Sequence, residues 1–122
     1  MGGQVSAQQR SEHGKVNSVH SLDQWQKQFQ SSKSSNKLMV IDFSADWCGP
    51  CKLIEPAVHD LAIEFSDVEF IKIDVDELPD VANNYDVQAM PTFVLVKSGK
   101  ELERTVGVKK DQLHTMIEKH SL

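Results

Sequence analysis

The chain has 122 residues, of which 39% are hydrophobic and 25% are charged. This is the composition of one globular domain, and the length leaves no room for a second. No apolar run approaches the roughly 18 residues that a membrane-spanning helix needs, and residues 1–36 lack the apolar stretch of a signal peptide. We therefore expect neither a membrane span nor export.

The formal net charge of −5 is unevenly distributed along the chain. Residues 1–36 carry a net charge of +2, so the rest of the chain carries −7. Between Asp60 and Asp86, nine acidic residues stand against a single base, Lys72. An acidic body repels a phosphate backbone and an acidic membrane surface. The charge therefore excludes nucleic acid as an expected partner and favours a basic protein surface.

Residues 1–15 are rich in Gly, Gln and Ser, which predicts a flexible N-terminal arm ahead of one domain over residues 16–122. The first six residues, MGGQVS, match a pattern in which Gly2 is myristoylated. The alternative is an unmodified, disordered start. Because one acyl chain anchors only marginally and the arm has no polybasic cluster or cysteine, we expect at most weak membrane contact through Gly2.

The first regular elements follow the arm. A short edge strand is predicted over residues 15–20. Ser21 is a candidate N-cap for a helix, because Leu22, Trp25 and Phe29 recur at helical spacing after it. The polar stretch 31–36 (SSKSSN) predicts that this helix ends there in a linker.

Strands and helices then alternate. Residues 38–43 form a near-continuous apolar run, typical of a strand buried on both faces, and Asp42 is its one acid. The rest of the pattern predicts, in order, a helix over about 48–65, a strand over 68–75, a short helix over 77–85, a strand over 92–96, a turn at 98–100, a strand over 101–106 and a helix over 109–119.

This order defines the expected topology. A helical crossover between the first core strands implies parallel pairing, and the tight turn at 98–100 forces the last two strands to be antiparallel. We therefore predict an α/β fold with a mixed central β-sheet. Its parallel core and antiparallel C-terminal hairpin are flanked by helices on both faces.

Cys48 and Cys51 are the only cysteines, in the sequence WCGPCK (47–52), where the predicted strand meets the helix. A helix N-terminus favours negative charge, so it stabilises the thiolate, which is the nucleophilic form of Cys48. Cys51, one turn further in, should be more buried and should resolve the mixed disulfide that Cys48 forms. One alternative is half a zinc site, although zinc takes four ligands and there is no second cysteine pair. Another is a structural disulfide, which would close almost no loop and stabilise little.

Residues 37–119 resemble a thioredoxin, specifically a plant h-type thioredoxin. The matching residues are Asp42, WCGPCK (47–52), Pro56, Lys72, Met90-Pro91-Thr92, Gly99 and Gly107. The resemblance implies the thioredoxin fold and the reduction of disulfides in target proteins by the Cys48/Cys51 dithiol. It also implies no bound cofactor or metal, with electrons supplied by NADPH through thioredoxin reductase. Some h-type relatives use an N-terminal cysteine for reduction by glutaredoxin, and Gln4 at that place favours the reductase.

Asp42 is an unusual residue for a strand buried on both faces. Burial without solvent raises the pKa of a carboxyl group. By resemblance Asp42 serves Cys51 as a base, and Lys72 is its charge partner. The alternative for Asp42 is an inert, paired carboxylate in the core. The alternative for Lys72 is a strand lysine whose charged end simply reaches solvent.

Pro91 follows Met90 just before a predicted strand. By analogy the bond between them is cis, which leaves the Met90 backbone open to pair with a substrate chain as an added strand. The alternative is an ordinary proline at a strand entry. The residues expected to form a flat apolar rim around Cys48 are Trp47, Gly49, Pro50, Met90 and Gly107.

The residues between the cysteines bear on the direction of the reaction. Relatives that oxidise or isomerise disulfides usually place a histidine there, which stabilises the thiolate and therefore the reduced form. Gly49 and Pro50 supply no such charge, so the reduced protein should be a reductant. We expect a cytoplasmic protein-disulfide reductase, partly membrane-associated if Gly2 is acylated. The alternative function is a non-catalytic thioredoxin-like binding module or holdase.

Overall fold

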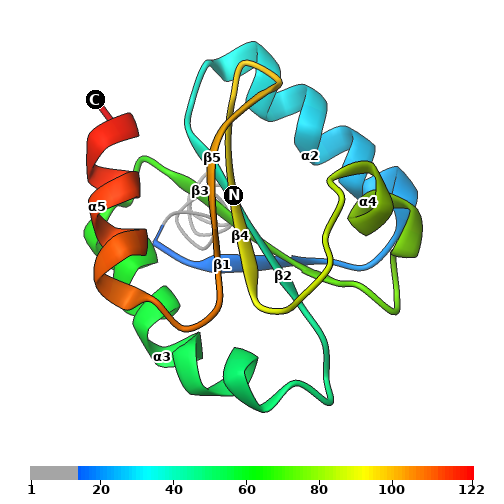
Figure 1. Cartoon of the computed structure of the whole chain (residues 1–122). Helices are drawn as coiled ribbons and strands as arrows, with labels where there is room; N and C mark the ends of the chain where they lie inside the picture. Colours follow the sequence, from blue (N-terminus) through cyan, green and yellow to red (C-terminus); the bar gives the residue numbers. More distant parts are fainter. Residues whose placement is uncertain (1–13) are drawn as a thin grey trace, which may run out of the picture.

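In the computed structural model, residues 14–122 are described, and they form a five-stranded sheet with helices on both faces (Figure 1). The elements are β1 (Val16–Val19), α2 (Leu22–Ser35), β2 (Met39–Ser44), α3 (Gly49–Glu64), β3 (Glu69–Asp74), α4 (Pro79–Asn84), β4 (Thr92–Lys97), β5 (Lys100–Val106) and α5 (Lys110–His120). Residues 1–13 of the expected arm, with Gly2, lie outside the described residues. Within the described part, no helix has the length and apolarity to cross a membrane.

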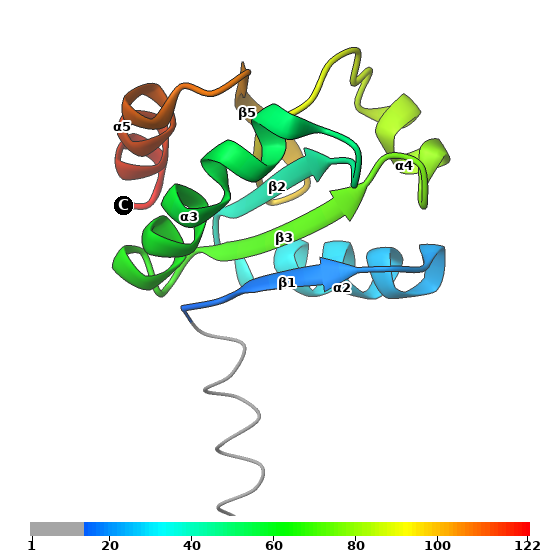
Figure 2. The ribbon, with the colours of Figure 1, turned by 90° about the horizontal axis from the view of Figure 1, so that it is seen from below.

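The strand order is β1-β3-β2-β4-β5, with β2 in the centre. β3 pairs in parallel with β1 on one side and β2 on the other, while β4 pairs antiparallel with both β2 and β5. The predicted mixed sheet, with its parallel core and C-terminal hairpin, is confirmed. Ser98 and Gly99 make the hairpin turn with positive φ angles of 53° and 81°. Seen from below, β1, β2 and β3 run in the same direction (Figure 2).

The core lies on both faces of β2, whose six residues are all buried. Side chains alternate between the two faces of a strand. Met39, Ile41 and Phe43 pack in the cluster that includes residues of α2 and α4, whereas Val40 packs in the cluster that includes residues of α3 and α5. By the same alternation, Asp42 points towards the side of the sheet that α3 covers.

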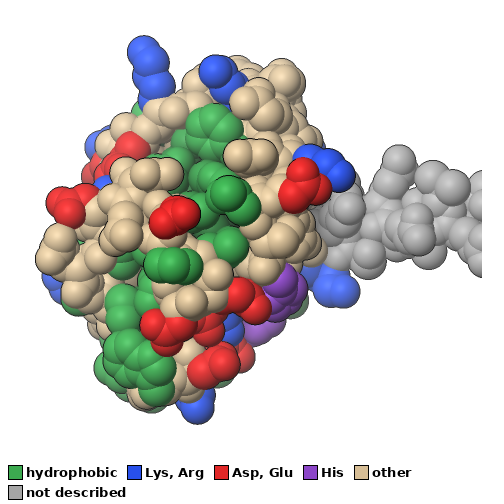
Figure 3. All heavy atoms as spheres, turned by 90° about the vertical axis from the view of Figure 1, so that its right-hand side faces the viewer, with side chains coloured by type: hydrophobic (Ala, Val, Ile, Leu, Met, Phe, Trp, Pro, Cys, Tyr) green, Lys and Arg blue, Asp and Glu red, His purple; other side chains and the backbone are tan. Residues whose placement is uncertain are grey.

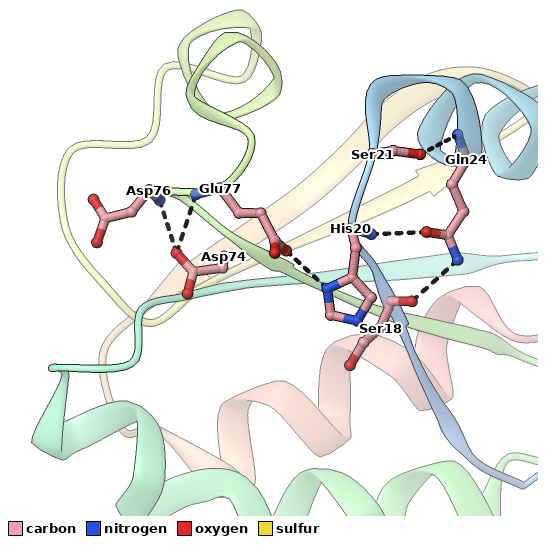
Figure 4. Close-up of polar contacts among 7 residues, drawn as sticks. All are labelled: Ser18, His20, Ser21, Gln24, Asp74, Asp76 and Glu77. Carbon is pink, nitrogen blue, oxygen red and sulfur yellow. Dashed lines mark hydrogen bonds and ion pairs between the residues drawn. The ribbon is translucent and has the colours of Figure 1, made fainter.

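The start of α2 is fixed by side-chain capping, as predicted. Ser21 is the N-cap, and its Oγ accepts a hydrogen bond of 3.1 Å from the backbone N–H of Gln24. The Gln24 side chain accepts from the His20 N–H at 2.8 Å and donates to the Ser18 carbonyl at 3.3 Å (Figure 4). These bonds join the end of β1 to the first turn of α2.

The predicted end of this helix was wrong. The helix continues through the serine-rich stretch to Ser35 and ends at Asn36, whose φ of 60° is left-handed. Ser32 is buried, and the Ser35 hydroxyl donates to the Ser32 carbonyl at 3.0 Å. Serine is a poor helix former in isolation, so packing of the Ser32 position against the protein decides the outcome here.

Candidate active site

The two cysteines lie where β2 gives way to α3, and a disulfide joins them with their Cα atoms 5.3 Å apart. Cys48 is the N-cap of α3, with φ −87° and ψ 106°. Its Sγ accepts a hydrogen bond of 3.2 Å from the backbone N–H of Cys51. The sulfur of Cys48 therefore stands where capping oxygens stand in other helices.

The surroundings of Cys48 favour negative charge on its sulfur. The helix α3 has 16 residues, and its first turn contains no acidic side chain that would compete for the unpaired N–H groups. Pro50 occupies one of the first two positions of the helix, where its missing N–H leaves no hydrogen bond unmade. When the disulfide opens, the Cys51 N–H and the helix dipole both stabilise a thiolate on Cys48.

The expectation that Cys51 is more buried than Cys48 was wrong for this oxidised form. The exposed fractions are 4% for Cys48 and 5% for Cys51. Both cysteines pack with Ala45 in one apolar cluster, against which Met90 is also packed. Because the disulfide holds the two sulfurs together, the same neighbouring side chains bury both cysteines, and their exposed fractions differ little.

The predicted cis peptide bond between Met90 and Pro91 is confirmed. Met90 is half-buried against the cysteine cluster, and the N–H of Gly107 donates to the Pro91 carbonyl at 2.8 Å. Gly107 has a φ of 95°, a conformation that a residue with a Cβ rarely adopts. The structure thus brings Met90, Pro91 and Gly107, which are far apart from the cysteines in sequence, to the same end of the sheet.

Trp47 is the most prominent apolar side chain next to the disulfide, with 67% of it exposed. Its Nε1–H donates to Asp76 Oδ2 at 2.7 Å, a contact that sequence reasoning missed. The exposed Val106 and Val108 flank Gly107 and extend the expected rim, and they too were missed. No motif marked any of the three; only the fold places them here.

Acidic side chains accompany this apolar surface. On the side of the molecule that carries α2 and α4, hydrophobic groups form a broken band from the upper middle to the lower left, and several Asp and Glu side chains lie beside its lower part (Figure 3). Asp74, the last residue of β3, accepts hydrogen bonds from the backbone N–H groups of Asp76 and Glu77 in the loop that follows, and Glu77 bonds to His20 at 2.8 Å (Figure 4). The loop that contains Asp76, the acceptor of the Trp47 N–H, is therefore bonded to His20, the residue that follows β1.

Asp42 is buried, with 6% of it exposed, and its Oδ1 makes no hydrogen bond to any described residue. Burial raises the pKa of this carboxyl to about 7. The positive charge of Lys72 acts against this rise in pKa, and the negative charge of Glu55 adds to it. Asp42 is thus a carboxyl group whose proton can be exchanged near neutral pH.

Lys72 only partly fills the role expected of it. It lies opposite Asp42 in the β2–β3 register and lowers the pKa of that carboxyl, as a charge partner should. However, its ion pair is with Glu55, at 3.0 Å. Asp42, Lys72 and Glu55 line one pocket of about 200 Å³, together with Val16, Ser18, Val58 and His59. Glu55 was missed, although its place four residues after Cys51 puts the two on one face of a helix.

Metal ligation finds no support in the residues described. Within residues 14–122, no group of three or more His, Cys, Asp or Glu side chains is arranged to hold a metal ion. His114 and His120 each bond to a glutamate on the surface, Glu64 and Glu103. The zinc alternative therefore has no ligand set in this part of the chain.

A reactive cysteine pair at the end of a central strand, capping the helix that follows, is the arrangement of a thiol–disulfide oxidoreductase. The family model described as Thioredoxin matches residues 16–119. The chain belongs to the thioredoxin family, and it is therefore a protein-disulfide reductase.

Individual relatives narrow the comparison to the plant h-type. Thioredoxin H2 of Arabidopsis thaliana is 56% identical over 115 residues, covering 94% of this chain and 86% of that protein. Thioredoxin H2-2 of Oryza sativa subsp. japonica is 57% identical over 104 residues, covering 84% and 78%. The crystal structure of thioredoxin NaTrxh from Nicotiana alata matches with a TM-score of 0.87 and 56% identity, over 88% of this chain and 94% of that one.

Proposed function

We propose that Cys48 is the attacking residue and Cys51 the resolving residue of a dithiol that reduces protein disulfides. The Cys48 thiolate attacks one sulfur of the target disulfide, forming a mixed disulfide and releasing the other target sulfur as a thiolate. The observation that carries this assignment is the position of Cys48 Sγ as N-cap of α3, where it accepts the Cys51 N–H. Cys51 has no such donor for its own sulfur among the described hydrogen bonds.

The second step needs the thiol proton of Cys51 to be removed. The Cys51 thiol gives its proton to the Asp42 carboxylate, its sulfur attacks Cys48 Sγ, and the bond between Cys48 and the target sulfur breaks. The Cys48 thiolate and the Cys51 thiol are then oxidised to one disulfide, and the target disulfide is reduced to two thiolates, while Asp42 holds the proton that Cys51 gave up. A carboxyl group with a pKa of about 7 can both accept and release this proton at neutral pH.

Regeneration completes the cycle. Thioredoxin reductase, using NADPH, returns two electrons to the Cys48–Cys51 disulfide, so that this chain binds no cofactor itself. Gly49 and Pro50, without a histidine between the cysteines, support a role as reductant rather than oxidant. Trp47, Met90, Pro91 and Gly107 form the surface on which the target and the reductase bind.

Binding to a membrane is a separate part of the proposal. A cytoplasmic protein with myristoylated Gly2 would associate weakly with membranes through its single acyl chain. The MGGQVS start supports this. Labelling with an alkyne analogue of myristate should mark the full chain but not the Gly2→Ala variant, and equal labelling of both would contradict acylation at Gly2.

The reductase activity is tested by the precipitation of insulin in the presence of dithiothreitol. The folded protein should accelerate precipitation well beyond dithiothreitol alone. No acceleration would contradict the proposal and favour a non-catalytic binding module. The roles of the two cysteines are tested in a cell extract, where Cys51→Ser should retain target proteins covalently on Cys48 and Cys48→Ser should retain far fewer. Comparable retention by the two variants would overturn the assignment.

A further inference from the structure

One cation, Lys72, and two carboxyl groups, Asp42 and Glu55, line the same pocket. Lys72 projects from β3, Asp42 from the adjacent β2, and Glu55 from α3, one turn after Cys51. The Lys72 Nζ is 3.0 Å from Glu55 Oε2, and no ion pair with Asp42 is formed within 4.0 Å among the described residues. Asp42 is almost fully buried, whereas the side chains of Lys72 and Glu55 are 34% and 44% exposed.

We propose that Glu55 is a positioning residue that holds the Lys72 ammonium group away from Asp42, and so leaves the Asp42 carboxyl free to exchange a proton with Cys51. This inference rests on the proposed function, because it concerns the proton step at Cys51. It assigns to Glu55 a role in that step without contact with the reacting sulfurs. Glu55 acts through Lys72, which alone can neutralise the buried carboxylate from a neighbouring strand.

The energetic argument compares the two partners available to Lys72. A charge-assisted hydrogen bond from Lys72 to Asp42 would stabilise the carboxylate and remove its ability to hold a proton near neutral pH. Forming it would require the ammonium group to leave solvent, which costs more for a buried pair than for a half-exposed one. Glu55 offers Lys72 a carboxylate at the mouth of the pocket, where both groups keep part of their hydration.

The other groups around Asp42 do not replace this arrangement. From α3, His59 also lines the pocket, but it makes no ion pair with a described residue. From β1, the lining residues Val16 and Ser18 carry no charge, and from β4 the register partner of Asp42 is Phe93. Lys72 also lines a second pocket with four titratable residues: His20, Asp46, Asp74 and Glu77. None of these forms an ion pair with Lys72, so Glu55 is its partner in the described structure.

The test is a titration of the Asp42 carboxyl carbon by NMR in the oxidised protein labelled with ¹³C-aspartate. Glu55→Gln should lower the pKa of Asp42 by about one unit, because Lys72 becomes available to the buried carboxylate. In the Lys72→Gln background the same substitution should lower the pKa by less than half as much, since only the direct repulsion by Glu55 is then lost. Glu64→Gln, on the same helix and also in an ion pair, is the matched control and should leave the Asp42 titration unchanged.

Two results would overturn the inference: no shift with Glu55→Gln, or an equal shift with and without Lys72. The second would show that Glu55 acts only through its own charge. Glu55→Ala repeats the measurement in case the amide of Gln makes a new hydrogen bond. The titration is made on the disulfide form, so it reports on Glu55 regardless of how Cys51 reacts. The proposed function is tested apart from it: Asp42→Asn should slow the release of target from the mixed disulfide, and an unchanged rate would contradict the base role of Asp42 while leaving the Glu55 titration valid.

Discussion

Asp42 and Lys72 lie directly opposite each other in the parallel register of β2 and β3, and yet no hydrogen bond joins their side chains in the described structure. A buried carboxyl with an unpaired oxygen is destabilising when it is charged. Ionisation of Asp42 should therefore lower the free energy of unfolding of the protein.

The pH dependence of that stability can be predicted. The pKa of Asp42 is about 7 in the folded protein and near the ordinary aspartate value of 3.8 when the chain is unfolded. Its contribution to stability is thus fully present below pH 3.8 and is lost as the pH rises through 7. The side chain of Asp42→Asn cannot ionise, so the free energy of unfolding of the variant should rise relative to that of the native protein across this range. At about 1.4 kcal/mol per pKa unit, the relative increase should reach roughly 4 kcal/mol above pH 7.

Urea unfolding of the oxidised proteins at a series of pH values measures this difference. Asp60→Asn, an exposed acid on α3, is the control and should show no such trend. If the difference in unfolding free energy between Asp42→Asn and the native protein does not change with pH, the raised pKa of Asp42 is wrong.

Asp76 should influence the use of protein substrates through Trp47. Removing the acceptor of the Trp47 Nε1–H in Asp76→Ala frees an exposed ring that borders the disulfide. A hydrogen bond of this kind contributes about 1 kcal/mol, so KM for insulin should rise by about fivefold while kcat stays nearly constant. Reduction of a small aromatic disulfide, which needs little of the rim, should be unaffected.

Glu77→Ala is the matched control for this effect, because Glu77 lies in the same loop but bonds to His20. It removes the same charge without touching Trp47. An equal rise in KM for both variants would attribute the effect to the charge of the loop rather than to the indole contact.

Two glycines beside the cysteines should respond differently to substitution by alanine. At neither Gly49 nor Gly107 would an added Cβ meet an atom within 4 Å, but Gly107 has a φ of 95°. Gly107→Ala should therefore lose about 1–2 kcal/mol of stability from backbone strain alone. Gly49→Ala, in the first turn of α3, should be neutral or gain less than about 1 kcal/mol. Thermal unfolding of both variants makes the comparison, and equal losses would contradict it.

The N-cap of α2 is worth testing because the capping residue and its controls lie in one helix. Ser21→Ala removes the acceptor of the Gln24 N–H and should cost about 1 kcal/mol in urea unfolding. Ser31→Ala, at an exposed position inside the same helix, should be neutral or slightly stabilising because alanine is the better helix former. A loss at position 31 as large as at 21 would show that capping is not responsible.

The fold was largely predictable because its patterns are local. The apolar run at 38–43 indicated a buried central strand, and the turn at 98–100 indicated the terminal hairpin, both of which the structure contains. The end of α2 was not predictable, since burial of Ser32 depends on what packs against the helix. Local propensity favoured a linker there, and tertiary packing overrode it.

The site divides in the same way. Cys48 and Cys51 stand out from sequence because their spacing and helix position carry the chemistry. Glu55 and Asp76 do not stand out from sequence, because each contacts a residue in another part of the chain. Glu55 pairs with Lys72 on β3, and Asp76 accepts from Trp47, which precedes α3. Such pairings depend on strand order, and a single sequence without a fold does not specify which surface acid meets which partner.

The central position of β2 has a consequence for local opening of the sheet. Its backbone is hydrogen-bonded to neighbours on both sides, whereas β1 and β5 are edge strands with one neighbour each. Amide protons of such a doubly paired, buried strand exchange with deuterium only in the rarest openings, while edges exchange sooner. The cysteine pair follows the end of one of these doubly paired strands, so we expect openings at the edges of the sheet to leave the spacing of the two sulfurs unchanged.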